Sequence, residues 1–294
     1  MILVDLNQVM ISNLMVTINS RHFDGSLNEG LIRHQVLNTL RFYRNKFGEE
    51  YNELVICCDD RHYWRKEVFP YYKAGRKKDR EKSDLDWHMI FEVLNKIRDE
   101  LKTTFPYKVL QVEGAEADDL IGALCHEYGH LGINGADPEK ILILSSDKDF
   151  MQLQKYANVD QFSPIQKKFL RCSNPARYIN EHIMRGDRGD GVPNFLSDDD
   201  CFVNGKRQKP LGIKKIDSWN GKKPEEFCNE RMLRGFRRNQ QLVDLDYTPE
   251  AIKYRKEVIE TNGQNNTYFT GAYLKNGLHE GAISSAFETA KNLL

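Results

Sequence analysis

The sequence predicts an α/β fold with a mostly parallel central sheet flanked by helices, followed by a smaller C-terminal helical domain. Three observations support this prediction. Short apolar runs alternate with helix-period segments over the first two thirds of the chain. The four clearest runs have no charged residue in their interior, which is typical of buried parallel strands. From about residue 186 the sequence becomes turn-rich and polar, then basic, without a convincing strand.

The predicted elements follow one another in a regular order. Strands are expected at 2–4, 54–58, 108–112 and 141–144, and residues 159–163 and 168–171 are expected to add a further strand or hairpin. Two helical stripes lie between them. The first consists of Ile32, Val36, Leu40, Tyr43 and Phe47, and the second of Trp87, Ile90, Leu94, Ile97 and Leu101. Apolar residues at this spacing predict the buried faces of helices.

The length of 294 residues is about twice that of a typical domain of ~150 residues, so two units are expected. The change to turn-rich, polar sequence predicts that the first unit spans 1–185 and the second spans 186–294. No apolar run approaches the roughly 18 residues of a membrane span, and the N-terminus does not resemble a secretory signal. Six cysteines without C-x-x-C spacing are expected to be free thiols. Together these features predict a cytoplasmic protein without a membrane partner.

Carboxylates stand where the predicted strands end. Asp5 ends the first strand, Asp59 the second, and Asp147 and Asp149 follow the fourth. Parallel strands bring these ends to one edge of the sheet, which is where α/β folds place their sites. The full set of acids at element ends is Asp5, Asp59, Glu116, Asp118, Asp119, Asp147, Asp149, Asp187 and Asp190. Taken singly, an acid at a helix N-terminus is explained by the helix dipole, which contributes only ~0.3 to 1 kcal/mol.

Crowding of these acids points to metal ions. Two carboxylates 4 Å apart repel each other by roughly 4 kcal/mol at an effective dielectric of ~20, so such a cluster requires protons or cations. Ligands that are all oxygen favour hard ions, here Mg²⁺ with Mn²⁺ as a substitute. Two such ions can activate water and stabilise the leaving oxygen in phosphodiester cleavage. The sequence therefore predicts a phosphodiester hydrolase with a two-metal mechanism.

Five motifs in order carry a family resemblance: Val4-Asp5, Cys58-Asp59, residues 116–119, residues 145–150 and residues 186–193. With Tyr63-Trp64-Arg65 after the second acid, the chain resembles the 5′ nuclease (flap endonuclease) family, and especially its bacteriophage members with ribonuclease H activity. The resemblance implies a PIN-like core. It also implies metal-dependent 5′ to 3′ exonuclease and flap endonuclease activity that removes RNA primers and adjacent DNA during replication.

The resemblance also implies how the acids divide between two ions. Asp59, Glu116, Asp118 and Asp147 resemble the ligands of the tighter ion, with Asp5 beside them through water. The second, looser ion is expected at three aspartates, and Asp119 is expected as an outer ligand. The three aspartates are Asp149, Asp187 and Asp190.

Residues 61–82 hold nine basic residues against three acidic ones, with aromatic residues interleaved. A charged run of this kind is often a solvated face, but cations and aromatic rings also suit a single strand or frayed end. The resemblance makes residues 61–84 an arch through which the 5′ end passes. It implies that Lys73 and Arg76 hold the scissile phosphate and that Tyr72 stacks on a base. Arg65, Lys66, Lys77 and Lys78 are expected to bind nucleic acid, and residues 77–82 to be disordered without substrate.

The C-terminal region resembles a helix-hairpin DNA-binding unit, interrupted by an insertion at 194–209 that contains three consecutive aspartates. Lys214 and Lys215 follow the insertion and are candidate duplex contacts. Arg231, Arg234 and Arg238 share one helical face, where solvation and duplex contact are both open. The chain has 43 basic and 43 acidic residues, so setting the nine clustered acids aside leaves an excess of positive charge.

The expected partners are DNA and RNA–DNA duplexes with 5′ ends or flaps, bound by a monomer. A single-strand-binding protein or a sliding clamp is a further candidate partner, and the expected location is the cytoplasm of an infected bacterium. Three rival interpretations remain. One is a catalytically silent DNA-junction binder, and another is a small RNA-cleaving nuclease of the PIN fold. The third is a zinc protease, because residues 126–130 spell H-E-x-x-H, although the acids would then be unexplained.

Overall fold

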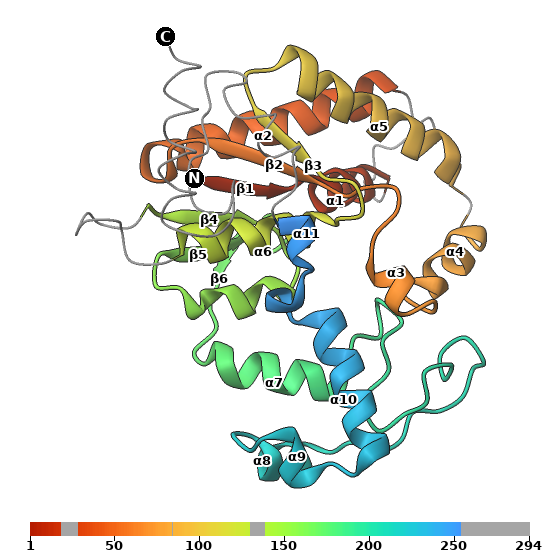
Figure 1. Ribbon diagram of the computed structural model, residues 1–294. Coiled ribbons are helices and arrows are strands. Elements are labelled where there is room, and N and C mark those ends of the chain that lie inside the picture. Colours follow the sequence, from red (N-terminus) through yellow and green to blue (C-terminus); the bar gives the residue numbers. More distant parts are fainter. Residues whose placement is uncertain (19–28, 84, 130–138, 254–294) are drawn as a thin grey trace.

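A six-stranded sheet forms the centre of the computed structural model, which describes residues 1–18, 29–83, 85–129 and 139–253 (Figure 1). The strands are β1 (Ile2–Asp5), β2 (Leu54–Cys58), β3 (Lys108–Gln111), β4 (Ile141–Leu144), β5 (Val159–Ser163) and β6 (Lys168–Leu170). Their order across the sheet is β3-β2-β1-β4-β5-β6. The first five are parallel, and β6 runs antiparallel to β5. This confirms the predicted α/β class and the predicted strands to within a residue at their ends.

Strand β1 lies between β2 and β4, so three carboxyl ends meet at one edge. Val4 is in register with Ile56 on β2 and with Leu144 on β4. Asp5 closes β1, while Asp59 follows directly after β2 and Asp147 lies three residues after β4. The topology therefore places these three carboxylates on neighbouring strands at the same edge.

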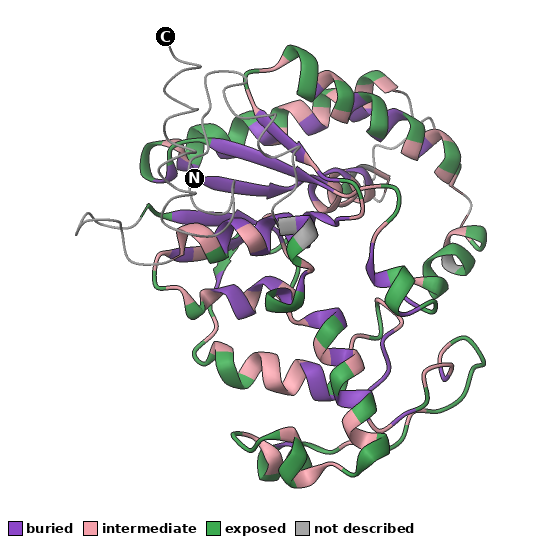
Figure 2. Cartoon of the chain, in the orientation of Figure 1, coloured by how far each residue is buried: buried purple, intermediate pink, exposed green. Residues whose placement is uncertain are grey.

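Helices cover both faces of the sheet. One face is covered by α1 (Leu6–Ile18), α2 (Glu29–Tyr51) and α5 (Trp87–Thr104), whose apolar stripes pack on strand residues such as Val4 and Ile56. The two predicted stripes are buried there, with Trp87 at the margin (Figure 2). Helix α1 was not predicted, because its apolar residues continue directly from those of β1.

The other face is covered by segments from two distant parts of the chain. Helix α6 (Ala117–Tyr128) and the 3-10 helix η2 (Asp149–Lys155) pack against Leu3, Val55 and Ile143. The chain returns to this core near its end through η3 (Leu245–Tyr247) and α11 (Glu250–Lys253). Residues beyond the predicted division at 185/186 thus contribute to the sheet core, and that division stays a prediction.

A third apolar cluster lies below the sheet in Figure 1. It joins α7 (Pro175–Arg185), α8 (Ile213–Trp219), α9 (Pro224–Phe227) and α10 (Glu230–Val243). Phe69 and Tyr72, which lie between α3 (Arg65–Val68) and α4 (Ala74–Glu81), also belong to it. The base of the basic segment is therefore anchored on the helical region.

Residues 77–82 were expected to be disordered without substrate, but the structure places most of them in helix α4. Lysine, arginine, glutamate and alanine all have high helix propensity, which favours this conformation. Lys77 and Glu81 form an ion pair one turn apart, and the Arg80 guanidinium lies 5.3 Å from the centre of the Phe91 ring. The ring contact attaches α4 to α5.

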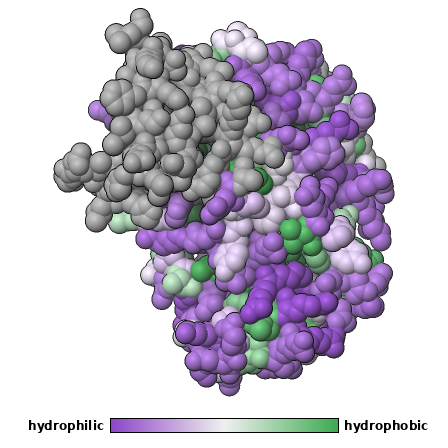
Figure 3. Space-filling view, in the orientation of Figure 1, coloured by the Kyte–Doolittle hydropathy of each residue, from purple (hydrophilic) through white to green (hydrophobic). Residues whose placement is uncertain are grey.

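Other expectations concern the cysteines and the membrane. All six cysteines are free, and Cys57, Cys58, Cys125 and Cys201 are buried. In the described ranges no helix combines the length and the apolar character that a bilayer crossing requires. The face shown in Figure 3 is mostly hydrophilic outside the grey atoms.

Candidate metal centre

Five of the predicted acids line one cavity of about 1260 Å³ at the carboxyl edge of the sheet. Asp5 comes from β1, Asp59 follows β2, and Asp147 follows β4, while Glu116 and Asp118 lie at the start of α6. The acid side chains vary in exposure from Glu116, which is 1% exposed, to Asp147, which is exposed at the mouth. The structure therefore brings together the whole set assigned to the tighter ion.

Neighbouring polar groups hold these carboxylates in place. The Asn7 side-chain amide donates to Asp59 at 2.7 Å, and the backbone N–H of Ala117 donates to the other oxygen of Asp59 at 2.8 Å. The Ser145 hydroxyl donates to Asp5 at 3.0 Å. Asn7 and Ser145 were not predicted as site residues, although each lies two residues from an acid that was.

Mutual repulsion and burial shift the acids toward their neutral forms. Burial, together with the charges of Asp59 and Asp147, raises the pKa of Asp5 to about 7. Burial and the charges of Asp147 and Asp5 also raise the pKa of Asp118 well above its usual value. Partial removal from water and the nearby Asp149 raise the pKa of Asp147 to about 6. A cation that binds among such acids replaces the protons that would otherwise neutralise them.

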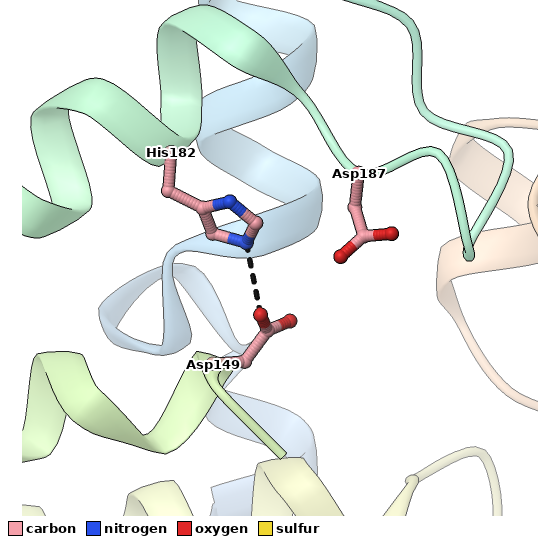
Figure 4. A group of neighbouring side chains, drawn as sticks. All are labelled: Asp149, His182 and Asp187. Carbon is pink, nitrogen blue, oxygen red and sulfur yellow. Dashed lines mark ion pairs between the residues drawn. The ribbon is translucent and has the colours of Figure 1, made fainter.

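A second group lies beside the first. Asp149 at the start of η2, Asp187 after α7 and His182 on α7 each place a ligand atom within 4.8 Å of the other two (Figure 4). They line a smaller cavity of about 450 Å³, which shares Asp147 with the large one. Sequence reasoning predicted the two aspartates but missed His182, which no motif marks.

Asp190, predicted as the third acid of the looser site, lies nearer to the basic segment. It accepts a hydrogen bond from the Tyr72 hydroxyl at 2.8 Å and forms an ion pair with Arg76. The Lys73 ammonium lies 3.7 Å from Asp190 and 2.5 Å from Glu116. Burial alone would raise the pKa of Asp190, but Lys73 and Arg76 outweigh it and lower that pKa. The structure thus joins the predicted catalytic cations to the predicted metal ligands.

The aromatic role expected of Tyr72 does not match its position. Its ring is 3% exposed within the third apolar cluster, and its hydroxyl is directed at Glu116 and Asp190. A ring in this position has no face available for a base. Tyr63, whose ring meets Tyr72 edge-on at 5.8 Å, lines the large cavity and is partly exposed.

Two other residues have structural positions that differ from the expectation. Arg65 is 2% exposed, so it is not placed to bind nucleic acid, and its guanidinium pairs with Glu116 at 3.0 Å and Asp119 at 2.8 Å. Asp119 is fully buried and also accepts hydrogen bonds from Trp64 and Thr248. Asp118 and Asp119 are about 100° apart around α6, so one faces the cavity and the other faces the core.

The remaining basic residues of the segment are exposed. Lys66 and Lys77 line the large cavity, whereas Lys78 is exposed outside its lining. Lys66, Arg76, Lys77 and Arg80 together form one basic wall of the cavity. A wall of this kind attracts a phosphate backbone.

The C-terminal candidates divide into two groups. Lys214 and Lys215 are exposed at the start of α8. Arg231, Arg234 and Arg238 are paired with aspartates of the insertion, Arg231 with Asp198 and the other two with Asp199. Arg238 is only 10% exposed and donates to the carbonyl of Pro193, so it is not a surface contact. The insertion therefore covers this arginine face with its own acids.

Comparison with known proteins gives the context for this site. Residues 2–182 match the family model described as the 5′-3′ exonuclease, N-terminal resolvase-like domain. The chain belongs to this family. It is 31% identical over 288 residues to the ribonuclease H of Enterobacteria phage T4, covering 92% of both chains. It is also 31% identical over 150 residues to a 5′-3′ exonuclease of Buchnera aphidicola, covering 48% of this chain and 46% of that one.

Solved structures of the 5′-3′ exonuclease type share the fold. The bacteriophage T5 5′-exonuclease with bound zinc ions has a TM-score of 0.59, 15% identity and coverage of 100% of this chain and 99% of its own. The T5 flap endonuclease in a complex with DNA and metal ions has a TM-score of 0.58, 15% identity and coverage of 99% and 98%. Both support the predicted PIN-like architecture.

Membership of the 5′-3′ exonuclease family removes the basis for the zinc-protease interpretation. His126 and Tyr128 lie in the last turns of α6, and a ring nitrogen of His126 lies 3.0 Å from the Tyr156 hydroxyl. His130, the last residue of the H-E-x-x-H match, lies outside the described residues. The acids at the opposite end of α6 are accounted for by the nuclease site.

Proposed function

We propose that the chain is a divalent-metal-dependent 5′ to 3′ exonuclease and structure-specific flap endonuclease with ribonuclease H activity. It would remove RNA primers and adjacent DNA during replication, acting on duplexes with 5′ ends or flaps. The observation that carries this proposal is the large cavity, in which acids from three neighbouring strand ends face a basic wall from the arch. The names of the T4 and T5 relatives support the same activities.

The residues present fit divalent ions. Their donor atoms are mostly carboxylate oxygens, and burial together with repulsion among them raises the pKa of Asp5 and Asp147. We assign the first ion to Asp59, Glu116, Asp118 and Asp147, with Asp5 beside them, and the second to Asp149, Asp187 and Asp190. Mg²⁺ is the proposed ion and Mn²⁺ its substitute, since hard ions prefer oxygen. Such a pair lowers the pKa of water and stabilises negative charge on departing oxygens.

Lys73 and Arg76 are proposed to bind the phosphate that is cleaved. Both now pair with carboxylates of the site, and a phosphate presents the same kind of paired anionic oxygens. The Tyr72 hydroxyl lies between the two carboxylates that these cations pair with, 2.8 Å from Asp190 and 3.1 Å from Glu116. Exposed Lys66, Lys77, Lys78, Lys214 and Lys215 are proposed to bind the backbone on either side.

The oligomeric state, the cellular location and the protein partners are also proposals. We infer a monomer acting in the cytoplasm of an infected bacterium, in keeping with the T4 relative. A single-strand-binding protein or sliding clamp would bring it to replication forks.

The function is tested by cleavage of end-labelled flap, nicked and RNA–DNA hybrid substrates. With Mg²⁺, short products from the 5′ end are expected on all three, and EDTA should abolish them because the acids then lack their cations. Binding to the same substrates without any cleavage in Mg²⁺ or Mn²⁺ would instead indicate a silent junction binder. Products that persist in EDTA would also contradict the proposal.

Lys73→Ala tests the role of the arch cations. Single-turnover cleavage should fall by roughly 10²-fold, the scale for removing one charge-stabilising group, while substrate affinity changes much less. Lys140→Ala is the matched control and should cleave at the native rate, because Lys140 is 58% exposed, pairs with Glu50 and does not line the cavity. Equal rates for the native chain and the Lys73 variant would rule out the assigned role.

A further inference from the structure

His182 is directed at the two acids of the smaller cavity. Its Nε2 atom lies 2.9 Å from a carboxylate oxygen of Asp149, and the Asp187 carboxylate lies beside the ring (Figure 4). The ring is 13% exposed and stacks on Tyr178 at 5.9 Å between centres, so its direction is held by α7 itself. Helix α7 in turn packs on η2, which carries Asp149.

The charges around this group differ from those of the neighbouring site. Glu116 and Asp190 are neutralised by Lys73 and Arg76. Among the described residues, no lysine or arginine forms an ion pair with Asp149 or Asp187. Lys148 also lines this cavity, but within the described ranges His182 is the basic side chain that pairs with one of the two acids.

The buried Nε2 atom has no hydrogen-bond partner within the described part of the chain. Its nearest charged neighbour is Asp149 at 2.9 Å, an ion pair that requires the ring to be protonated. Buried polar atoms are usually satisfied, so Nε2 of a neutral ring at this position requires a partner. Coordination of a cation between the ring and the two carboxylates supplies one.

We propose that Nε2 of His182 is a ligand of the second metal ion, together with Asp149 and Asp187. This inference rests on the proposed nuclease function. The two sites then differ in chemistry, since the first offers only oxygen and the second offers one imidazole nitrogen and carboxylate oxygens. Imidazole increases affinity for Mn²⁺ and later transition metals relative to Mg²⁺, which dehydrates reluctantly and prefers oxygen. His182 therefore raises the affinity of the second site for Mn²⁺, relative to Mg²⁺, above that of the all-oxygen first site.

Pulsed electron paramagnetic resonance on the full-length chain with Mn²⁺ tests the bond directly. Nitrogen-14 modulation from a directly bound imidazole is expected in the native protein, absent in His182→Ala and retained in His88→Ala. His88 is the matched control because it is an exposed histidine on α5 that lines neither of the two acidic cavities. Titration calorimetry should show Mn²⁺ affinity at one site falling roughly tenfold or more in His182→Ala, with a smaller change for Mg²⁺.

The inference is wrong if the native chain shows no nitrogen modulation, or if His182→Ala retains it. Equal loss of Mg²⁺ and Mn²⁺ affinity would show that His182 only positions Asp149. If His182→Ala does not fold by circular dichroism, His182→Gln, which keeps a polar side chain without an imidazole, replaces it. Failure of the proposed nuclease function would be observed separately, because the native chain would then leave the substrates intact and still show the nitrogen modulation.

Discussion

Asp147→Asn is expected to lower single-turnover cleavage by roughly 10²- to 10³-fold, the scale for loss of one charged group in an active site. Asp147 is a proposed ligand of the first ion and is the acid common to both cavities. Asparagine keeps the shape but removes the charge that binds a dication. Duplex affinity should stay close to native, because the basic wall is unchanged and one repulsive charge is removed.

A quenched single-turnover assay with Mg²⁺ measures the cleavage rate, and a binding assay without Mg²⁺ measures the duplex affinity. Asp217→Asn is the matched control, since Asp217 is 45% exposed and pairs with Arg177 on the surface. It should cleave at the native rate. Native-like turnover of the Asp147 variant would contradict the assignment of this residue.

The same variant, which lowers the cleavage rate, should raise the stability of the protein when no metal is bound. The pKa of Asp147 is raised from 3.8 to about 6 by partial burial and by Asp149. A raised pKa means that stability is full below about pH 4 and is lost as the pH rises through about 6. Asp147→Asn removes that loss, so in EDTA it should unfold at a higher temperature than the native chain above pH 6 and at the same temperature near pH 4. Lower stability at high pH would indicate a structural role instead.

Arg65→Met is expected to destabilise the fold by about 3 to 5 kcal/mol, the usual cost of leaving buried charges without their partner. Arg65 pairs with both Glu116 and Asp119 and donates to the carbonyl of Leu242 at 2.9 Å. Methionine fills similar space but removes the cation that pairs with the buried Asp119 and leaves Glu116 with Lys73 alone. Because Leu242 is on α10, the loss should also loosen the helical region from the sheet.

Urea unfolding monitored by circular dichroism measures this effect. Arg177→Met is the matched control, because its ion pair with Asp217 is half exposed and such pairs contribute only about 0 to 1 kcal/mol. A change below 1 kcal/mol for Arg65→Met would show that the buried pairs do not stabilise the fold.

The sheet and the main acid cluster were predictable from local patterns. Apolar runs of strand length identified four strands, residues 159–163 and 168–171 were predicted as a further strand or hairpin, and the acids at the strand ends identified the edge where the cavity forms. This works because a parallel sheet places its carboxyl ends together whatever the details of packing. Asp5, Asp59 and Asp147 follow from that rule alone.

Side-chain direction and long-range pairing could not be predicted in the same way. Asp118 and Asp119 are adjacent in sequence, yet only the packing of α6 decides which of them faces the cavity. Arg65 was assigned to nucleic acid because it lies in a basic run, and its buried partners are more than fifty residues away. His182 becomes part of the site only because α7 packs on η2, a contact that no local motif encodes.

The acidic insertion affects how binding should respond to ionic strength. Arg231 and Arg234 already have carboxylate partners, so a phosphate that reaches them must first displace Asp198 and Asp199. Each displaced aspartate takes up a cation from solution, which partly cancels the counter-ions released from DNA. The logarithm of affinity should therefore fall less steeply with the logarithm of salt concentration than the number of exposed arginines suggests.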